Sequence, residues 1–295
     1  MKECTLCPRN CLCNRTDGEL GFCGEKETIR ISRAALHFWE EPFISGKEGS
    51  GAVFFSGCNL RCIYCQNREI ALGRKGKEVS VSRLAEIYLE LQAQGANNIN
   101  LVTGAHFISG IRESLLEAKK SGLTIPVVYN SSGYELPESL KLLEGLVDIY
   151  LPDFKYMDKK KAQAYSHAED YPERAKAALA EMFRQVGEVQ TDERGMLRKG
   201  MVVRHLLLPL GVGNAKGVVD YVYETYGDKV YFSLMNQFTP CITQEKHTEL
   251  NRKVTAREYN RLLDYVMEKG ITNAFIQVGD TAKESFIPDF DFEGV

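Results

Sequence analysis

The sequence predicts an α/β fold in which strands and helices alternate to build a full or partial barrel, preceded by a short cysteine-rich segment. After Gly51, β-type and helix-type segments follow one another with short connections, which require parallel pairing and right-handed crossovers. A doubly wound open sheet is the competing arrangement. It would carry a glycine-rich nucleotide-binding turn after its first strand, where this chain has a cysteine-rich loop. We therefore expect an extension at residues 1–50 and a barrel at residues 51–295.

Strands are expected where short runs rich in β-branched and other apolar residues occur. Their ranges are 52–56, 98–102, 125–129, 147–151, 201–208, 230–234 and 274–278. The segment 158–200 is longer than a simple crossover and repeats apolar residues at helical spacing from Ala175 to Val186, so it predicts an elaborated connection. The acidic segment from Asp289 to Glu293 predicts a solvated tail.

Two helices have recognisable ends in the sequence. Ser82 is a candidate N-cap for a helix that ends at Gly95. Thr255 and Glu258 have the spacing of a capping box, and the helix that follows them ends at Gly270. Both patterns predict helices of the scaffold.

Composition limits the classes of function. The chain has 295 residues, of which 44% are hydrophobic and 26% charged, as in a folded globular protein. Its 37 basic and 40 acidic residues give a net charge of −3, so no overall basic field is present for nucleic acid or an anionic membrane. No run approaches the roughly 18 apolar residues of a membrane span, and no apolar signal segment follows Met1. We expect a cytoplasmic protein.

Cysteine is the unusual component of the sequence. There are nine, of which five lie in the first 23 residues and three between positions 58 and 65. An odd number, in a chain long enough to fold without disulfide bonds, indicates metal-binding or catalytic thiols. Cys241 stands alone, and we expect it to be a packing residue.

Cys58, Cys62 and Cys65 lie on one short loop immediately after the first barrel strand. A structural zinc site takes four protein ligands and a cubane iron-sulfur cluster normally takes four cysteines, so three local thiols leave one coordination position open. A structural zinc knuckle is the alternative, but no fourth Cys or His is near. The spacing C-x3-C-x2-C, with Tyr64 before the third cysteine, resembles the signature of the radical S-adenosylmethionine superfamily.

The resemblance extends from about Cys4 to about Gln277 and is closest to the pyruvate formate-lyase activating enzyme-like (PflX-type) branch. It rests on phrases at the ends of predicted strands. These are residues 65–67 (CQN), 100–103 (NLVT), 148–155 (DIYLPDFK), 204–209 (RHLLLP) and 234–237 (LMNQ).

The resemblance implies a partial (β/α)6 TIM-like barrel in which the three cysteines hold a [4Fe-4S] cluster with one open iron. In such enzymes that iron binds the amino and carboxylate groups of S-adenosylmethionine. The reduced cluster cleaves this cofactor to a 5′-deoxyadenosyl radical, which abstracts hydrogen from a substrate. A one-electron donor such as flavodoxin or ferredoxin is then expected as a partner, and the enzyme itself is expected to be a monomer.

Side chains at the carboxyl ends of parallel strands surround one pocket in such a barrel. The cofactor contacts that the resemblance implies are Tyr64, Asn67, Thr103, Gly104, Asn130, Ser131, Asp153, Lys155, Arg204, Asn236 and Gln237. Asp153 and Lys155, two residues apart, would face the same side, and the resemblance also assigns them catalytic roles. Arg204 and His205 would point to opposite faces of their strand.

The chain departs from the family at the end of the second strand. Where the family carries a Gly-Gly-Glu-type motif, this sequence has Thr103, Gly104, Ala105 and His106. Thr103 or a nearby carbonyl would then accept from the cofactor's amino group. His106 is the third candidate catalytic residue, and its role there would be that of a proton donor. Two alternatives are a contact to the cofactor and a loop histidine whose hydrogen bonds are satisfied within the protein.

The N-terminal cysteines are compact enough to surround one metal centre, either zinc or a second iron-sulfur cluster. Cys4, Cys7, Cys11 and Cys23 match positions seen in the resembled branch, whereas Cys13 does not. A structural site that seals the barrel is the favoured interpretation, and an auxiliary electron-transfer cluster is the alternative.

The leading functional hypothesis is hydrogen abstraction by a radical S-adenosylmethionine enzyme, from a glycyl residue of a partner enzyme. A small molecule or a peptide is the alternative substrate. A non-catalytic metal-binding or redox-sensing protein is a second hypothesis, although a sensor needs no polar groups at so many strand ends. Nucleic-acid modification is disfavoured by the acidic balance of charges.

Overall fold

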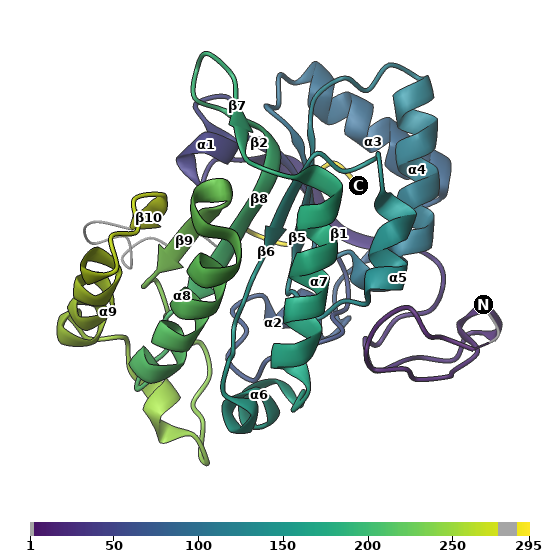
Figure 1. The fold of residues 1–295 in the computed structure, drawn as a ribbon. Helices are drawn as coiled ribbons and strands as arrows, with labels where there is room; N and C mark the ends of the chain where they lie inside the picture. Colours follow the sequence, from purple (N-terminus) through teal and green to yellow (C-terminus); the bar gives the residue numbers. More distant parts are fainter. Residues whose placement is uncertain (1–2, 277–287) are drawn as a thin grey trace.

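The structure is a computed structural model that describes residues 3–276 and 288–295. Its centre is a curved sheet of parallel strands, with the longer helices packed against it (Figure 1). The parallel strands are β2 (Ser50–Phe55), β4 (Ile99–Val102), β5 (Val127–Ser131), β6 (Ile149–Pro152), β8 (Leu197–Leu206), β9 (Tyr231–Met235) and β10 (Ala274–Ile276). Antiparallel pairs add β1 (Arg30–His37), β3 (Lys77–Glu78) and β7 (Gln190–Thr191).

The order of the strands shows that the barrel is incomplete. The order is β10-β9-β8-β6-β5-β4-β2-β1-β3, and β7 pairs with β8. In the described residues, the parallel partner of β2 is β4 and that of β10 is β9, so the first and last parallel strands do not meet. The predicted α/β class with a partial TIM-like barrel is therefore confirmed.

Helices connect the parallel strands. The longer ones are α3 (Val81–Ala93), α4 (Ile108–Lys120), α7 (Tyr171–Val186), α8 (Val212–Tyr226) and α9 (Ala256–Glu268). The shorter ones are α1 (Pro42–Ser45), α2 (Arg68–Ala71), α5 (Pro137–Leu140) and α6 (Lys159–Ser166). Short 3-10 helices are η1 (Arg15–Asp17), η2 (Ala105–Phe107), η3 (Lys141–Leu143), η4 (Gly227–Lys229) and η5 (Thr248–Asn251).

The core lies on both faces of the sheet. Every residue of β2, β4, β5 and β6 is buried. This is the pattern of a parallel sheet covered on both sides, where strands are continuously apolar and do not alternate. The carboxyl ends of these strands therefore emerge from a rigid, buried scaffold.

The helix ends test the capping predictions. The capping box of Thr255 and Glu258 is confirmed, and α7 contains the predicted pattern that ends at Val186. The N-cap of α3 is Ser80, whose side chain accepts from the backbone N–H of Arg83, and not Ser82 as predicted. Ser82 is the second residue of the helix, and its hydroxyl donates to Glu117 of α4.

The strand β1 and the C-terminal segment change the predicted boundaries. A register irregularity between Ile31 and Arg33 interrupts the alternation of buried residues in β1, and for this reason the sequence pattern does not reveal the strand. Because β1 pairs with β2, the sheet begins before residue 51. The solvated tail is also a wrong prediction, since Phe290 is 8% exposed and its ring packs against that of Phe54. The strand expected at 274–278 is present to Ile276, and the rest lies outside the described residues.

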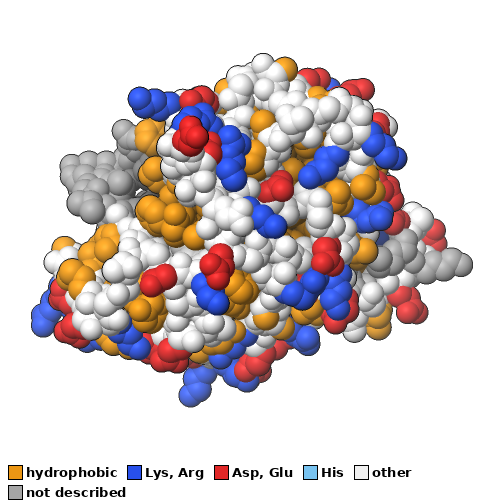
Figure 2. Space-filling model, turned by 45° about the horizontal axis from the view of Figure 1, so that its top comes forward, with side chains coloured by type: hydrophobic (Ala, Val, Ile, Leu, Met, Phe, Trp, Pro, Cys, Tyr) orange, Lys and Arg blue, Asp and Glu red, His pale blue; other side chains and the backbone are white. Residues whose placement is uncertain are grey.

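None of the described helices has the length and apolar character needed to cross a membrane. On the face shown in Figure 2, acidic and basic side chains are interspersed, with apolar side chains between them.

Candidate functional site

A cavity of about 240 Å³ lies where the parallel strands end. Its lining includes most of the predicted site residues, which come from segments far apart in the sequence. They are Cys58, Cys62, Tyr64, Cys65, Asn67, Thr103, Asn130, Ser131, Asp153, Lys155, Arg204 and Gln237. The topology brings these side chains together because the ends of parallel strands share one edge of the sheet.

The loop that carries the three cysteines is held from two sides. Its first residue, Gly57, has φ +81°, and a Cβ atom there would lie 2.8 Å from the carbonyl oxygen of Cys23, so a glycine is needed. The backbone N–H of Cys58 donates to that same carbonyl at 3.3 Å. On the other side, the N–H of Ile63 donates to the carbonyl of Tyr165 at 2.8 Å.

The three thiols are free and line the same cavity. Burial, followed by the charges of Cys62 and Cys58, raises the pKa of Cys65 to about 12, and burial with the charge of Cys62 also raises the pKa of Cys58. Three thiolates on one short loop repel one another unless a cationic centre binds them, so this donor set suits a metal cluster.

Arg204 organises the polar side of the cavity. Its guanidinium donates to Asp153 Oδ1 at 3.0 Å, to Glu40 Oε2 at 3.1 Å and to Asn130 Oδ1 at 2.6 Å. The ammonium of Lys155 lies 2.5 Å from Asp153 Oδ2, so Asp153 and Lys155 do face the same side. Burial by itself raises the pKa of Asp153, but Lys155 and Arg204 together lower it, and the carboxylate is ionised.

Glu40 is a site residue that the sequence did not reveal. It precedes α1, in the connection from the unpredicted strand β1, and it lines the cavity. Besides its ion pair with Arg204, its Oε1 accepts from Asn100 at 3.2 Å and from Asn130 at 3.3 Å. No motif marks this position, because the role of Glu40 depends on long-range packing.

Thr103 lies in the cavity in a rare backbone conformation. Its φ is +61°, which a β-branched residue seldom adopts, and its N–H donates to the carbonyl of Asn130 at 2.8 Å. Such a conformation costs on the order of 1–3 kcal/mol and occurs most often at functional sites. This is the position at which the family's Gly-Gly-Glu-type motif would begin.

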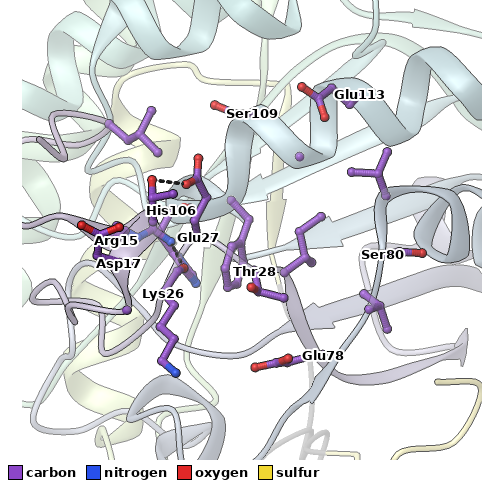
Figure 3. Close-up of a pocket in the computed structure, with 18 residues that line it drawn as sticks. Arg15, Asp17, Lys26, Glu27, Thr28, Glu78, Ser80, His106, Ser109 and Glu113 are labelled. Atoms are coloured by element: carbon purple, nitrogen blue, oxygen red, sulfur yellow. Dashed lines mark hydrogen bonds between the residues drawn. The ribbon is translucent and has the colours of Figure 1, made fainter. Parts of the chain in front are cut away.

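Three of the predicted cofactor-binding and catalytic residues do not line this cavity. Gly104 packs against α4, where a Cβ atom would lie 2.4 Å from Ile111 Cδ1. Asn236 follows β9, and its buried Oδ1 has no partner among the described residues. His106 lines a separate cavity of about 760 Å³ and lies near Arg15 (Figure 3).

His106 is a buried neutral histidine. It is 2% exposed, and its Nε2 lies 2.6 Å from the carbonyl oxygen of Ser56. A carbonyl only accepts, so Nε2 carries the proton and Nδ1 does not. Burial lowers the pKa of His106 to about 3. His205, which faces away from the cavity as predicted, bonds the carbonyl of Phe154 through Nδ1.

The N-terminal cysteines lie close to one another and to the central loop. A Cβ atom on Gly21 would lie 3.4 to 3.7 Å from the sulfurs of Cys11, Cys13 and Cys23. Burial raises the pKa of Cys7 to about 12, and Cys4, Cys7 and Cys23 are all buried.

Neither the central nor the N-terminal cysteines are arranged around a single metal ion in the described residues. Across residues 3–276 and 288–295, no three His, Cys, Asp or Glu side chains converge closely enough to hold one metal ion. A cubane cluster binds its cysteines through different irons, so its ligands need not meet at one point.

Comparison with known proteins finds a match for the central part of the chain. Residues 52–190 match the model of the radical SAM superfamily, and this segment contains all three cysteines of the loop. The uncharacterized protein MJ0674 of Methanocaldococcus jannaschii is 28% identical over 274 residues, which are 89% of this chain and 74% of that protein.

Two solved structures share the fold. Native anSMEcpe with bound AdoMet has a TM-score of 0.50 and 14% identity, over 75% of this chain and 61% of that one. Streptococcus suis SuiB has a TM-score of 0.50 and 14% identity, over 78% and 48%. This chain therefore matches about half to three fifths of the length of these structures, and the likeness is one of fold.

The neutral state of His106 predicts a pH dependence of stability. The folded protein keeps this imidazole unprotonated down to about pH 3, whereas the unfolded chain protonates it near 6.5. Its contribution is fully present above pH 6.5 and is lost as the pH falls towards 3. At about pH 5 we expect a loss of about 2 kcal/mol relative to about pH 7.5. Urea unfolding of wild type and His106→Gln at both pH values measures it.

The His106→Gln variant should lack this loss, so the two stability curves should converge as the pH falls. Glu135 has the opposite effect on the stability at low pH. Burial raises its pKa to about 7, so as the pH falls the folded state binds this proton before the unfolded state does, and folding is stabilised. Both proteins carry Glu135, so its effect cancels in the difference. Parallel curves would contradict the assignment of a neutral His106.

Proposed function

We propose that this protein is a radical SAM enzyme whose cluster is held by Cys58, Cys62 and Cys65. The observation that carries the proposal is that these thiols, inside the segment that matches the radical SAM superfamily, line one cavity with the polar residues at the strand ends. The three-thiol donor set fits a [4Fe-4S] cluster with one iron left for S-adenosylmethionine. When bound, the reduced cluster supplies one electron to the sulfonium, whose carbon-sulfur bond breaks to give methionine and a 5′-deoxyadenosyl radical.

The polar side chains of the cavity suit the charges of S-adenosylmethionine. Its carboxylate calls for a cation, and Lys155 and Arg204 are the cations among the described residues of the lining. Its ammonium calls for acceptors, and Glu40 and Asp153 supply carboxylates there. Because each of these groups is held by another member of the set, the chain presents them in fixed positions before the cofactor binds.

The ribose of the cofactor needs hydrogen-bonding groups, and the end of β5 supplies them. Asn130 and Ser131 line the cavity. Ser131 is fixed from behind, because its hydroxyl donates to Glu135 at 2.6 Å and accepts from the N–H of Gly133 at 3.0 Å. Buried polar groups in this arrangement orient a ligand with several hydroxyls.

For the substrate we propose a backbone glycine of a partner enzyme. The support is the resemblance to activating enzymes at the strand ends. In this reaction the glycine Cα would give up a hydrogen atom to the 5′-deoxyadenosyl radical, with 5′-deoxyadenosine and a glycyl radical as the products. One electron per turnover is then needed from a donor such as flavodoxin or ferredoxin.

Cofactor cleavage tests the enzyme hypothesis. We expect anaerobically reconstituted wild type, given dithionite and S-adenosylmethionine, to form 5′-deoxyadenosine, measured by chromatography. Cys62→Ala should form none above background because the cluster loses a ligand. Cys241→Ala is the matched control, since Cys241 is exposed and outside both cysteine sets, and it should keep wild-type activity. The hypothesis fails if wild type with a full cluster forms no more product than Cys62→Ala.

We also propose a second metal centre at Cys4, Cys7, Cys11 and Cys23, either an auxiliary iron-sulfur cluster or zinc. Zinc would require these thiols to move together, because they do not converge on one point in the described residues. Between residues 3 and 29 the 3-10 helix η1 is the only helix or strand, so little regular structure holds this segment together. The backbone N–H of Phe22 also donates to Cys11 Sγ at 3.2 Å, so the fold of this segment positions the sulfur. Metal binding commonly supplies the stability of such segments.

Metal content tests the second centre. A variant with Cys58, Cys62 and Cys65 all changed to Ala should retain zinc, or iron with sulfide, when it is purified without oxygen. Adding Cys7→Ser should remove that metal, whereas adding Cys241→Ala should not. A triple variant that contains neither metal would rule the centre out.

A further inference from the structure

The helix α6 contacts the cysteine loop directly. It lies in the long connection between β6 and β8, and its carboxyl end meets the loop. The Tyr165 carbonyl accepts from Ile63 N–H at 2.8 Å, and the Ser166 carbonyl accepts from the guanidinium of Arg9 at 2.8 Å. These backbone contacts fix the end of α6 independently of the side chain of Ser166.

The hydroxyl of Ser166 is aimed at a cysteine sulfur. Ser166 is fully buried, and its Oγ lies 3.0 Å from Cys62 Sγ. Two further hydroxyls continue the contact, because Tyr156 Oη lies 2.8 Å from Ser166 Oγ and 2.7 Å from Tyr64 Oη. Tyr64 lines the cavity, so the chain of hydroxyls runs from the cavity to the sulfur.

The direction of this chain follows from proton counting. Each hydroxyl has one hydrogen to donate. If Ser166 donates to the sulfur of Cys62, it must accept from Tyr156, and Tyr156 must in turn accept from Tyr64. All three O–H bonds then point towards the sulfur.

We propose that the Tyr64–Tyr156–Ser166 chain sets the reduction potential of the cluster at Cys58, Cys62 and Cys65. The proposal rests on the proposed function, because it concerns that cluster. Hydrogen bonds to ligand sulfurs are one of the levers by which a protein tunes an iron-sulfur potential. The reduced cluster carries one more negative charge than the oxidised one, so donors aimed at the sulfur stabilise the reduced form more. Aligned hydroxyls also polarise one another, which strengthens the terminal bond.

The chain gives the long connection between β6 and β8 a role. In that connection, α6 brings Ser166 to the sulfur of Cys62. Tyr156 comes from the segment just before α6, so one part of the chain supplies two of the three hydroxyls. The third, Tyr64, lies beside Cys65 on the loop itself.

The midpoint potential of the reconstituted full-length protein tests the proposal. It is measured by redox titration with electron paramagnetic resonance, on the signal that Cys62→Ala lacks. We expect Ser166→Ala to shift the midpoint to more negative potential at unchanged iron content. Tyr156→Phe, which keeps the ring and removes the middle donor, should shift it less in the same direction. If Ser166→Ala does not fold, the midpoint of Tyr156→Phe still tests the proposal.

Tyr165→Phe is the matched control. Its hydroxyl, one residue from Ser166, donates to Glu249 at 2.6 Å and not to the chain. Its midpoint should equal that of wild type. Wild-type midpoints in both Ser166→Ala and Tyr156→Phe, with intact clusters, would overturn the proposal and leave the enzyme function standing. A wild type that assembles no cluster would instead overturn the proposed function and this inference with it.

Discussion

The buried guanidinium of Arg204 is the interaction on which the cavity depends. Moving a charge from water into a protein costs several kcal/mol, and breaking a buried pair costs about 3–5 kcal/mol. Arg204 meets this cost through three partners, Asp153, Glu40 and Asn130. They come from the end of β6, the connection before α1 and the strand β5, so one side chain joins three distant segments. The position of each polar group in the cavity follows from that constraint.

A second constraint acts on the cysteine loop. The N-terminal segment contacts the loop through the carbonyl of Cys23, and α6 contacts it through the carbonyl of Tyr165. Arg9, in the N-terminal segment, links the loop to α6, because its guanidinium donates to the carbonyl of Asn59 at 2.7 Å and to the carbonyl of Ser166. The loop is thus fixed by backbone carbonyls on either side, which leaves its three thiols free to face the cavity. Hydrogen bonds around a ligand loop orient the residues that bind a metal.

The sequence predicted those parts of the site that depend on local patterns. The cysteine spacing identified the loop, and the alternation of strands with helices placed Asp153, Lys155 and Arg204 in one pocket, because strand ends in a parallel barrel share an edge. The side-chain period of a strand separated Arg204 from His205 correctly. Each of these inferences needs only residues close in sequence and a rule of the fold.

The remaining features depend on packing between distant segments. Glu40 lies after a strand whose alternation is broken by a register irregularity, so no pattern marks it. His106 is three residues past the cavity residue Thr103 in sequence. The turn at Thr103, with φ +61°, sends the chain into the 3-10 helix η2, so the imidazole lies in another cavity. Ser166 gains its significance only because α6 reaches back to the loop. Tertiary contacts decide all three positions.

The central claim is that the three-cysteine loop carries a cluster with an open iron that S-adenosylmethionine occupies. Electron paramagnetic resonance of the reduced protein, with and without the cofactor, tests it most directly. Direct coordination changes the surroundings of the open iron, so the account predicts that adding S-adenosylmethionine alters the spectrum, and that methionine labelled with 17O or 15N in the cofactor broadens or couples to the signal. A reduced cluster whose spectrum is identical with and without saturating cofactor would contradict the account.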